Sequence, residues 1–426
     1  MKTIQIGLLG FGTVGSGVVK ILNEHRTKIQ KVLGKTVNVS KILVRDLNKY
    51  QHMTEYAFTT SFDDIVEDDT IDIIVEVIGN VELSKGYIER ALKNGKHVVT
   101  ANKDLIALYG NELLQLAKEN HCDIFFEASV GGGIPILRTI ANSLSSDDIQ
   151  QVTGIVNGTT NFMLTQMADK NLSYAESLQL AQQFGFAESD PTNDVEGIDA
   201  AYKMVILSRL AFGMSVDIND LKIEGISKVS LADIQYAQQL GYCIKLIGYA
   251  QQKNRQYFGL VGCMLVPLTH PLANVHNENN AIVIRGAAMG QSMYYGLGAG
   301  QMPTANSVVS DVINIAQNMA LETNGELFSS FYQDKHLLNH DDVYFQTYFR
   351  LELRDKPGMF LKLTTEFSRL GISFSSILQN PISPEMAHVI IVTHPISQQT
   401  YDTICQNLQA MDDVTLKVSM HLLSEE

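Results

Sequence analysis

A glycine-rich hexapeptide beginning at residue 10 places the tightest limit on the fold. It follows an apolar, β-branched segment and opens a segment of helical period. In such a motif the first glycine permits a tight turn, the second lets the backbone approach a pyrophosphate, and the third lets the helix pack on the strand. The phosphates then lie at the positive N-terminus of the helix. The sequence therefore predicts a dinucleotide site made by Gly10, Phe11, Gly12, Thr13, Val14 and Gly15.

Short apolar runs alternate with helical segments around this motif. We predict strands at 3–9, 37–44, 71–78, 97–100 and 123–127, and helices near 13–31, 83–94 and 104–119. This βαβ order is typical of an α/β fold in which a Rossmann-like, doubly wound parallel sheet is covered on both faces. We assign this nucleotide domain to residues 1–130.

The rest of the chain divides into two further parts. Residues 131–300 mix helical and strand patterns, which predicts an α+β domain, and a polar stretch within 331–345 predicts a linker. Residues 346–426 follow the order strand, helix, strand, strand, helix, strand, which is the ferredoxin-like βαββαβ unit.

Composition excludes several classes of partner. The 32 basic and 46 acidic residues give a net charge of −14, which argues against nucleic acid as a partner. No uninterrupted run of 18 apolar residues is present, which argues against a membrane span, and glycines break the N-terminal run that a secretory signal would need. The four cysteines form no CxxC pair, so we expect free thiols in a reducing cytoplasm.

The end of the second predicted strand bears on the choice of coenzyme. An acidic residue there binds the ribose 2′-hydroxyl of NAD, whereas a nearby arginine accommodates the 2′-phosphate of NADP. Here Arg45 precedes Asp46. We therefore favour NADP, while Asp46 leaves NAD open, and both could instead be ordinary surface charges.

Two lysines are candidates for chemistry. Lys103 follows a buried strand, and functional groups in open α/β sheets gather at the carboxyl ends of strands. Lys203 lies four residues after Asp199, so the two share one helix face, although a solvated ion pair would look the same. The acidic run at 188–199 could form a negative pocket for an ammonium group, or could serve helix capping and solvation.

Two glycine-containing turns could bind charged groups. Residues 157–162, Asn-Gly-Thr-Thr-Asn-Phe, follow a strand and should begin a helix whose backbone N–H groups could hold a carboxylate or an oxyanion. Residues 127–135 form a glycine-rich turn whose carbonyls would suit a hard cation, although a close backbone crossing explains the glycines equally well.

These segments together resemble one family. GFGTVG at 10–15, TANK at 100–103, EASVGGGIP at 127–135, GIVNGTTNFM at 154–163, DVEGIDAAYK at 194–203 and GAGQMPTANSVVSD at 298–311 occur in the order typical of homoserine dehydrogenases, in the form with a C-terminal ACT domain. The resemblance implies reversible hydride transfer between NAD(P)H and aspartate 4-semialdehyde, which yields L-homoserine. It also implies that the segment at about 301–330 returns to the nucleotide domain, and that 131–300 is catalytic and dimerising.

The resemblance assigns roles by position. Lys203 is the expected acid/base residue, Asp199 and Glu188 the expected substrate ligands or orienting groups, and Lys103 a second active-site lysine that contacts substrate and coenzyme. A cation that also delivers a proton would stabilise the charge that develops on the aldehyde oxygen. The remaining assignments are Gly158 and Thr159 to the substrate, Gly300 to the coenzyme, and the carbonyls of Glu127, Val130, Gly132 and Ile134 to a sodium or potassium ion.

The tail resembles an ACT domain through Leu-Arg-Asp-Lys-Pro-Gly-Met-Phe at 353–360. Such domains pair edge to edge and bind small amino acids, so a homodimer or homotetramer with threonine as effector is expected, unless this copy serves only assembly. The resemblance further implies threonine, methionine and isoleucine biosynthesis, and we expect no aspartokinase segment.

Two rival functions stay open at this point. One is another NAD(P)-linked amino-alcohol dehydrogenase on the same scaffold, and the other is a non-catalytic nucleotide sensor. A thioester-forming semialdehyde dehydrogenase needs a nucleophilic cysteine, and no cysteine here lies in such a motif. The acidic residues and lysines argue against a pure sensor.

Overall fold

The computed structural model describes residues 3–325 and 333–424. Residues 1–2, 326–332 and 425–426, which include parts of the predicted segments 1–130, 301–330, 331–345 and 346–426, lie outside the described residues. The chain forms two compact units: Met1–Val152 with Tyr202–Ile218 and Ala281–Lys335, and Thr153–Ala201 with Asn219–Asn280 and His336–Glu426.

The first unit contains a six-stranded sheet in which every strand pairs in parallel with its neighbours. Its order is β3-β2-β1-β4-β5-β6, so the order reverses between β1 and β4, where ligands of open α/β sheets bind. The strands are β1 (Ile4–Leu9), β2 (Val37–Leu43), β3 (Phe58–Thr59), β4 (Ile73–Glu76), β5 (His97–Thr100) and β6 (Ile124–Phe125). The predicted Rossmann-like sheet is confirmed.

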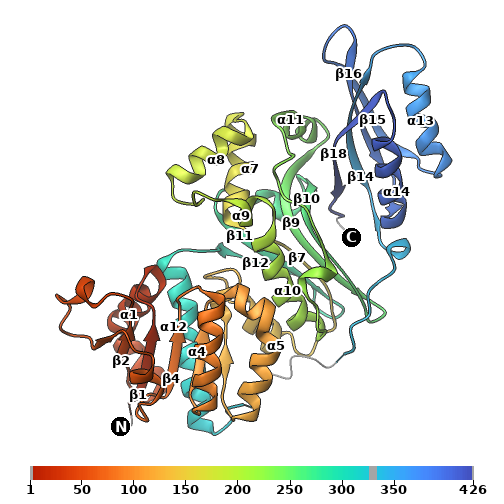
Figure 1. Ribbon diagram of the computed structural model, residues 1–426. Coiled ribbons are helices and arrows are strands. Elements are labelled where there is room, and N and C mark those ends of the chain that lie inside the picture. The colour runs from red at the N-terminus through yellow and green to blue at the C-terminus, as the bar shows by residue number, and fades with distance from the viewer. Residues whose placement is uncertain (1–2, 326–332, 425–426) are drawn as a thin grey trace. The chain divides into compact units, whose positions relative to one another are not determined.

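Helices cover this sheet. α1 packs against α12, and the side chains between them join the core beneath β1, while α4 and α5 lie side by side in Figure 1. The helices of this sheet are α1 (Thr13–Glu24), α2 (Arg26–Leu33), α3 (Asp63–Val66), α4 (Val81–Lys93), α5 (Lys103–Glu119) and α12 (Gln301–Leu321).

Three predicted elements differ from the structure. The single helix predicted at 13–31 is broken at His25, and the turn lets Ile29 join the buried cluster. The strand predicted at 71–78 ends at Glu76, because the next N–H groups turn toward the Glu76 carboxylate. The strand predicted at 123–127 is reduced to Ile124–Phe125, since the Glu127 N–H binds the Asp311 side chain instead of a neighbouring strand.

The middle of the chain mixes helices and strands, as predicted. Strands β12, β11 and β7 are consecutive neighbours, and β9 and β10 form a long antiparallel pair to which β8 adds in parallel. The elements are α6 (Ile136–Arg138), β7 (Ile149–Ile155), α7 (Gly158–Lys170), α8 (Tyr174–Gln183), α9 (Thr192–Val195), α10 (Ile198–Phe212), β8 (Leu221–Ile223), α11 (Leu231–Gln239), β9 (Tyr242–Lys253), β10 (Gln256–Pro267), β11 (Asn279–Gly286) and β12 (Gly290–Leu297).

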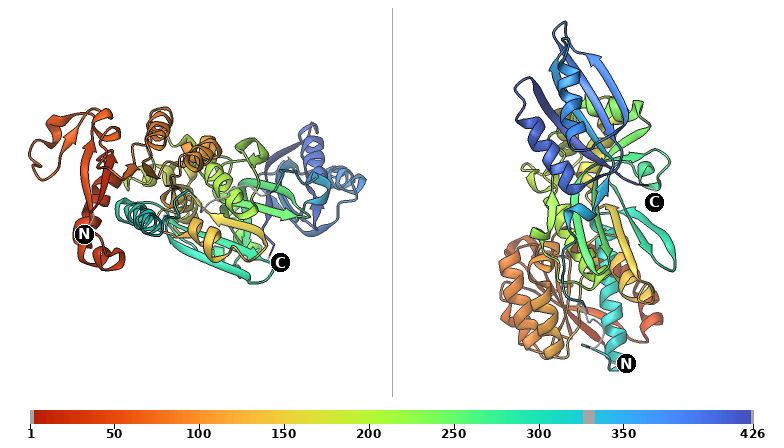
Figure 2. Two further views of the ribbon diagram at one scale, coloured as in Figure 1. Left: turned by 90° about the horizontal axis from the view of Figure 1, so that it is seen from below. Right: turned by 90° about the vertical axis from the view of Figure 1, so that its right-hand side faces the viewer.

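The C-terminal segment has the predicted ferredoxin-like topology. Its four main strands pair antiparallel in the order β18-β14-β16-β15, and α13 and α14 pack against each other on this sheet, as Figure 2 shows. β18 also pairs in parallel with β10, which extends the sheet. The elements are β13 (Tyr344–Phe345), β14 (Thr347–Arg354), α13 (Met359–Arg369), β15 (Phe374–Pro381), β16 (Met386–Thr393), β17 (Ile396–Ser397), α14 (Gln398–Gln409) and β18 (Val414–Leu422).

Within the described part of the chain, no helix combines the length and apolar content that crossing a bilayer requires. The four cysteines are free thiols.

Candidate active site

The glycine motif forms the turn from β1 into α1. Gly10 has a φ of +102°, a conformation that residues with a side chain rarely adopt. A Cβ on Gly15 would lie 2.2 Å from the Gly10 carbonyl oxygen, whereas one on Gly12 would meet nothing within 4 Å. Gly12 is also the N-cap of α1 and makes no side-chain cap. The turn therefore has no room for a side chain at Gly15 but leaves space beside Gly12, where a bound phosphate would approach the helix start.

A pocket of about 400 Å³ adjoins this turn. Gly10, Phe11 and Gly12 form one wall, and the end of β2 with Arg45 and Asp46 forms another. The Asp46 carboxylate accepts the Asn48 N–H at 2.9 Å and so caps a short 3₁₀ turn, while Arg45 is exposed.

Lys103 is the first residue of α5, directly after the carboxyl end of β5. The preceding Asn102 caps the helix by accepting the Leu105 N–H at 3.1 Å. The Lys103 side chain is 32% exposed, and its Nζ lies 3.7 Å from the Asp104 carboxylate. The helix start therefore presents an ammonium group that solvent can reach.

The start of α7 is built around Asn157. Its Oδ1 accepts the Thr160 N–H at 2.8 Å, which closes the helix N-terminus. Its Nδ2 donates to Asp194 at 2.7 Å and to Asp199 at 2.8 Å. One buried amide thus holds two carboxylates together, and Asp199 itself is 8% exposed. Two carboxylates at one donor concentrate negative charge, which suits an ammonium ligand.

Lys203 lies on α10, four residues after Asp199, so the two side chains leave the helix on one face. Further along α10, the buried Arg209 donates to the Ile106 carbonyl of α5 at 3.0 Å, and Asn111 at the middle of α5 contacts Ser215 just beyond α10 at 2.9 Å. Both contacts join α5 to the second half of α10 or to the residues that follow it.

The other predicted substrate residues have different surroundings. The chain at Gly158 is crossed closely by another segment, since a Cβ there would lie 2.7 Å from the Glu278 carbonyl oxygen. The hydroxyl of Thr159 donates to the Phe186 carbonyl at 2.6 Å. Glu188 lies on an exposed loop, where its carbonyl accepts from Gln182.

The glycine-rich turn at 130–134 offers a backbone cradle. Gly132 has a φ of +50°, and a Cβ on it would lie 2.5 Å from the Gly298 carbonyl oxygen. The backbone near Gly298 therefore passes close to this turn, as one of the two sequence interpretations expects. The Ser307 hydroxyl donates to the Gly132 carbonyl at 2.6 Å, and the Val130 N–H reaches the Glu127 carbonyl at 3.4 Å. Each carbonyl has a second lone pair, so these contacts leave room for a hard cation. Gly300, beyond this crossing, is the uncapped N-cap of α12.

Comparison with known proteins decides the family. Residues 10–127 match the model of the homoserine dehydrogenase NAD binding domain, and residues 135–313 match that of homoserine dehydrogenase. A homoserine dehydrogenase of Bacillus subtilis is 50% identical over 418 residues, which cover 97% of this chain and 96% of that protein. The chain belongs to the homoserine dehydrogenase family. It is an oxidoreductase that transfers a hydride between homoserine and aspartate 4-semialdehyde with a nicotinamide coenzyme.

Two solved homoserine dehydrogenases have the same fold. The one from Thiobacillus denitrificans superposes with a TM-score of 0.94 at 36% identity and covers 100% of this chain and 99% of its own. A hyperthermophilic archaeal homoserine dehydrogenase in complex with NADPH has a TM-score of 0.63 at 28% identity and covers 74% of this chain and 98% of its own.

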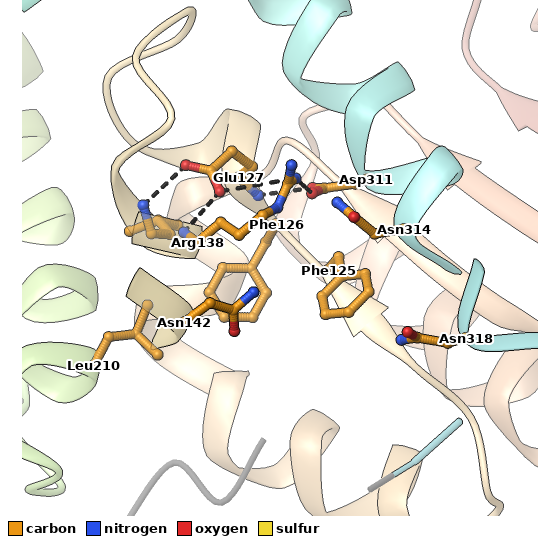
Figure 3. Close-up of a pocket in the computed structure, with 10 residues that line it drawn as sticks. Phe125, Phe126, Glu127, Arg138, Asn142, Leu210, Asp311, Asn314 and Asn318 are labelled. Atoms are coloured by element: carbon orange, nitrogen blue, oxygen red, sulfur yellow. Dashed lines mark hydrogen bonds and ion pairs between the residues drawn. The ribbon is translucent and has the colours of Figure 1, made fainter. Parts of the chain in front are cut away.

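The sequence did not predict a buried cluster of charged side chains near the glycine-rich turn. Figure 3 shows the Arg138 guanidinium between Glu127 and Asp311. The Glu127 carboxylate accepts the N–H groups of Leu137 and Arg138, each at 2.8 Å, and Arg138 pairs with Asp311 at 2.5 Å. Burial raises the pKa of Asp311 to about 7 and also raises the pKa of Glu127. The cluster fixes Glu127 at the start of the glycine-rich turn.

Asn157 and Asp194 were also not assigned as site residues. An Asn before a helix is a recognisable cap signal, which the motif at 157–162 did contain. Its bonds to Asp194 and Asp199 span 37 and 42 residues, and no local pattern encodes such a contact.

Proposed function

We propose that this enzyme uses Lys203 as its proton-transfer group and NADP(H) as its preferred coenzyme. The observation that carries the proposal is the single helix α10, which presents Asp199 and Lys203 on one face while Asn157 holds the Asp199 carboxylate in place. One face therefore offers a carboxylate for the substrate ammonium and an amine for its oxygen. Glu188, Gly158 and Thr159 are proposed to complete substrate binding.

In the oxidation, the homoserine hydroxyl loses its proton and its carbon loses a hydride. The Lys203 amine accepts the hydroxyl proton, and in the reverse direction the ammonium returns it to the aldehyde oxygen. Lys103 adds a positive charge that stabilises the oxyanion. The hydrogen bond from Arg209 to the Ile106 carbonyl, which joins α10 to α5, supports this pairing. When bound, the nicotinamide ring accepts or returns the hydride.

The coenzyme proposal rests on the pocket beside the glycine turn. The turn from Gly10 to Gly15 would hold the pyrophosphate at the uncapped start of α1, and Gly300 would contact the coenzyme at the start of α12. Arg45 is exposed at the pocket wall, while Asp46 is already engaged in a turn. These positions favour a 2′-phosphate on Arg45, and so NADP over NAD.

A monovalent cation is proposed at the glycine-rich turn. The carbonyls of Glu127, Val130, Gly132 and Ile134 would be its ligands, and the positive φ angles of Gly131 and Gly132 curve the backbone as such a cradle requires. Sodium or potassium would then brace the turn against the crossing segment near Gly298.

The C-terminal unit is proposed to be an ACT domain that binds threonine and joins subunits into a homodimer or homotetramer. The uncapped start of α13 at Gly358, with Asp355 in the preceding loop, supports a small-ligand site. We also propose a cytoplasmic enzyme that serves threonine, methionine and isoleucine synthesis. Threonine that fails to alter the rate of the full chain would contradict the effector assignment.

One assay tests the central roles: homoserine-dependent reduction of each coenzyme, followed at 340 nm. Lys203→Met should lower kcat by about 10²- to 10⁴-fold, the usual contribution of a proton-transfer group. Lys228→Met, the same change at an exposed lysine, is the matched control. Arg45→Ala should raise the KM for NADP by about tenfold and leave that for NAD unaltered. A normal rate for Lys203→Met, or equal losses for both coenzymes in Arg45→Ala, would overturn the respective role.

A further inference from the structure

A buried carboxylate lies where the order of the parallel sheet reverses. Glu76 is the last residue of β4 and is completely buried. In the sheet register it is paired with Leu9, which precedes the glycine motif, and with Thr100, which ends β5. Glu76 thus lies between the turn that would hold the phosphates and the segment that leads to Lys103.

The two oxygens of this carboxylate have different partners. Oε1 accepts the Ile78 N–H at 2.7 Å, the Gly79 N–H at 3.3 Å and the Ser84 hydroxyl at 2.8 Å. Oε2 accepts the Thr100 hydroxyl at 2.6 Å. One oxygen therefore holds the loop from β4 to α4, in which Ile78 lines the nucleotide pocket, and the other holds the end of β5.

Further hydrogen bonds lead from Thr100 to the start of α5, where Lys103 lies. The Thr100 oxygen accepts the Asn102 N–H at 3.0 Å, and the Asn102 Oδ1 caps α5. Among the described residues, the buried Asn102 Nδ2 has no hydrogen-bond partner. A buried donor left unpaired costs stability unless a ligand satisfies it, so this segment is arranged for a bound molecule.

We propose that Glu76 is a positioning residue that sets Asn102 and Lys103 against the nucleotide pocket. The inference rests on the proposed role of Lys103. Four neutral donors converge on one carboxylate, and only a group without hydrogens can accept from all of them. In Glu76→Gln, the new Nε2 would face the Thr100 oxygen, which already accepts from Asn102. The substitution would therefore disturb the β5 side, which leads to Lys103, while Oε1 keeps its three donors.

The test compares Glu76→Gln with Thr100→Val. The second variant removes the Thr100 hydroxyl, which donates to Glu76 Oε2. Both should lower kcat by about 10- to 100-fold, because small misplacements of reacting groups have effects of that size. NADPH affinity, measured by fluorescence titration, should stay within about threefold, since the pocket wall is retained. Thr100→Ser keeps the hydroxyl and should restore kcat. The double variant should be no slower than the slower single variant.

Thr393→Val is the matched control. Thr393 is a fully buried threonine at a strand end whose hydroxyl oxygen accepts the Thr347 N–H at 3.1 Å. It should reproduce any loss of thermal stability in Thr100→Val without the fall in kcat. If kcat in Glu76→Gln and Thr100→Val equals that of Thr393→Val, Glu76 has no positioning role. If Glu76→Gln does not fold, the contrast between Thr100→Val and Thr100→Ser decides the question.

Lys103→Met separates this inference from the function on which it rests. A normal kcat in Lys103→Met would remove Lys103 from the reaction and overturn both. A low kcat in Lys103→Met with normal rates in Glu76→Gln and Thr100→Val would overturn only the role of Glu76.

Discussion

Helices α1 and α7 each follow a strand, but their first backbone N–H groups have different partners. α1 begins at Gly12, which has no side chain to bind the free N–H groups. α7 begins at Asn157, whose side chain takes the Thr160 N–H and also donates to Asp194 and Asp199. We call a helix start open when no side chain caps it, as in α1, and closed when a side chain does, as in α7. The open start suits a bound anion, and the closed start of α7 orders two carboxylates for a bound cation.

The same distinction holds at other helices. α12 and α13 begin at Gly300 and Gly358 without a side-chain cap. The starts closed by an Asn or Ser side chain include those of α4, α5, α8, α11 and α14. The three starts at Gly12, Gly300 and Gly358 are those to which we assign ligands that carry phosphate or carboxylate groups.

Among the variants that compare helix starts, the largest expected effect is at the start of α7. Asn157→Ala removes a cap worth about 1 kcal/mol and leaves two carboxylates without their shared donor. We expect the KM for homoserine to rise by about 10- to 100-fold, because the carboxylate that recognises the ammonium group loses the hydrogen bond that orients it. Steady-state kinetics with saturating coenzyme measures this.

Ser173→Ala is the control for that change, because it removes a cap from the neighbouring α8 that touches neither carboxylate. It should lower stability by a similar amount while the KM for homoserine stays normal. Equal kinetic effects in both variants would mean that Asn157 is only a cap.

A second pair of variants tests the geometry of the open start. Gly15→Ala would place its Cβ 2.2 Å from the Gly10 carbonyl oxygen, a clash with backbone that we expect to cost about 1 to 3 kcal/mol. Gly12→Ala meets nothing within 4 Å and has a φ of −85°, so its melting temperature should match that of the wild type. Calorimetry without coenzyme compares them. Equal melting temperatures would show that the turn is less rigid than described.

The smallest expected effect concerns α14, another closed start. The buried His421 contacts Gln398, the first residue of α14, at 3.1 Å, and burial lowers the pKa of His421 from 6.5 to about 3. Because the unfolded chain binds this proton more tightly, His421 destabilises the fold progressively as the pH falls from 6.5 toward 3. His421→Gln should therefore lose less stability than the wild type between pH 7 and pH 5. Urea midpoints at the two pH values measure the difference, and parallel losses would contradict it.

Local sequence patterns predicted the helices and strands of this chain better than they predicted which of these elements contact one another. The glycine motif specified the β1 to α1 turn because each glycine answers a requirement within six residues. The Arg138 to Asp311 pair spans 173 residues. Strands β10 and β18 pair through Met264 and His421, which are 157 positions apart in the sequence. Such contacts follow from packing, which no window of sequence contains.

Helix boundaries show the same limit at short range. Hydrophobic period continued through His25, so one helix was predicted where two are present. The roles of Glu76 and Asn157 escaped prediction because each depends on donors or carboxylates that folding brings from other strands and loops.

The central claim is that the open start of α1 receives the coenzyme and the closed start of α7 does not. Fluorescence titration with NADPH tests it directly in the wild type, Gly12→Ala and Asn157→Ala. We predict a dissociation constant about tenfold or more higher in Gly12→Ala, where a methyl group would occupy the approach of the pyrophosphate, and a change of less than about twofold in Asn157→Ala. Unaltered NADPH binding by Gly12→Ala, with weakened binding by Asn157→Ala, would contradict the account.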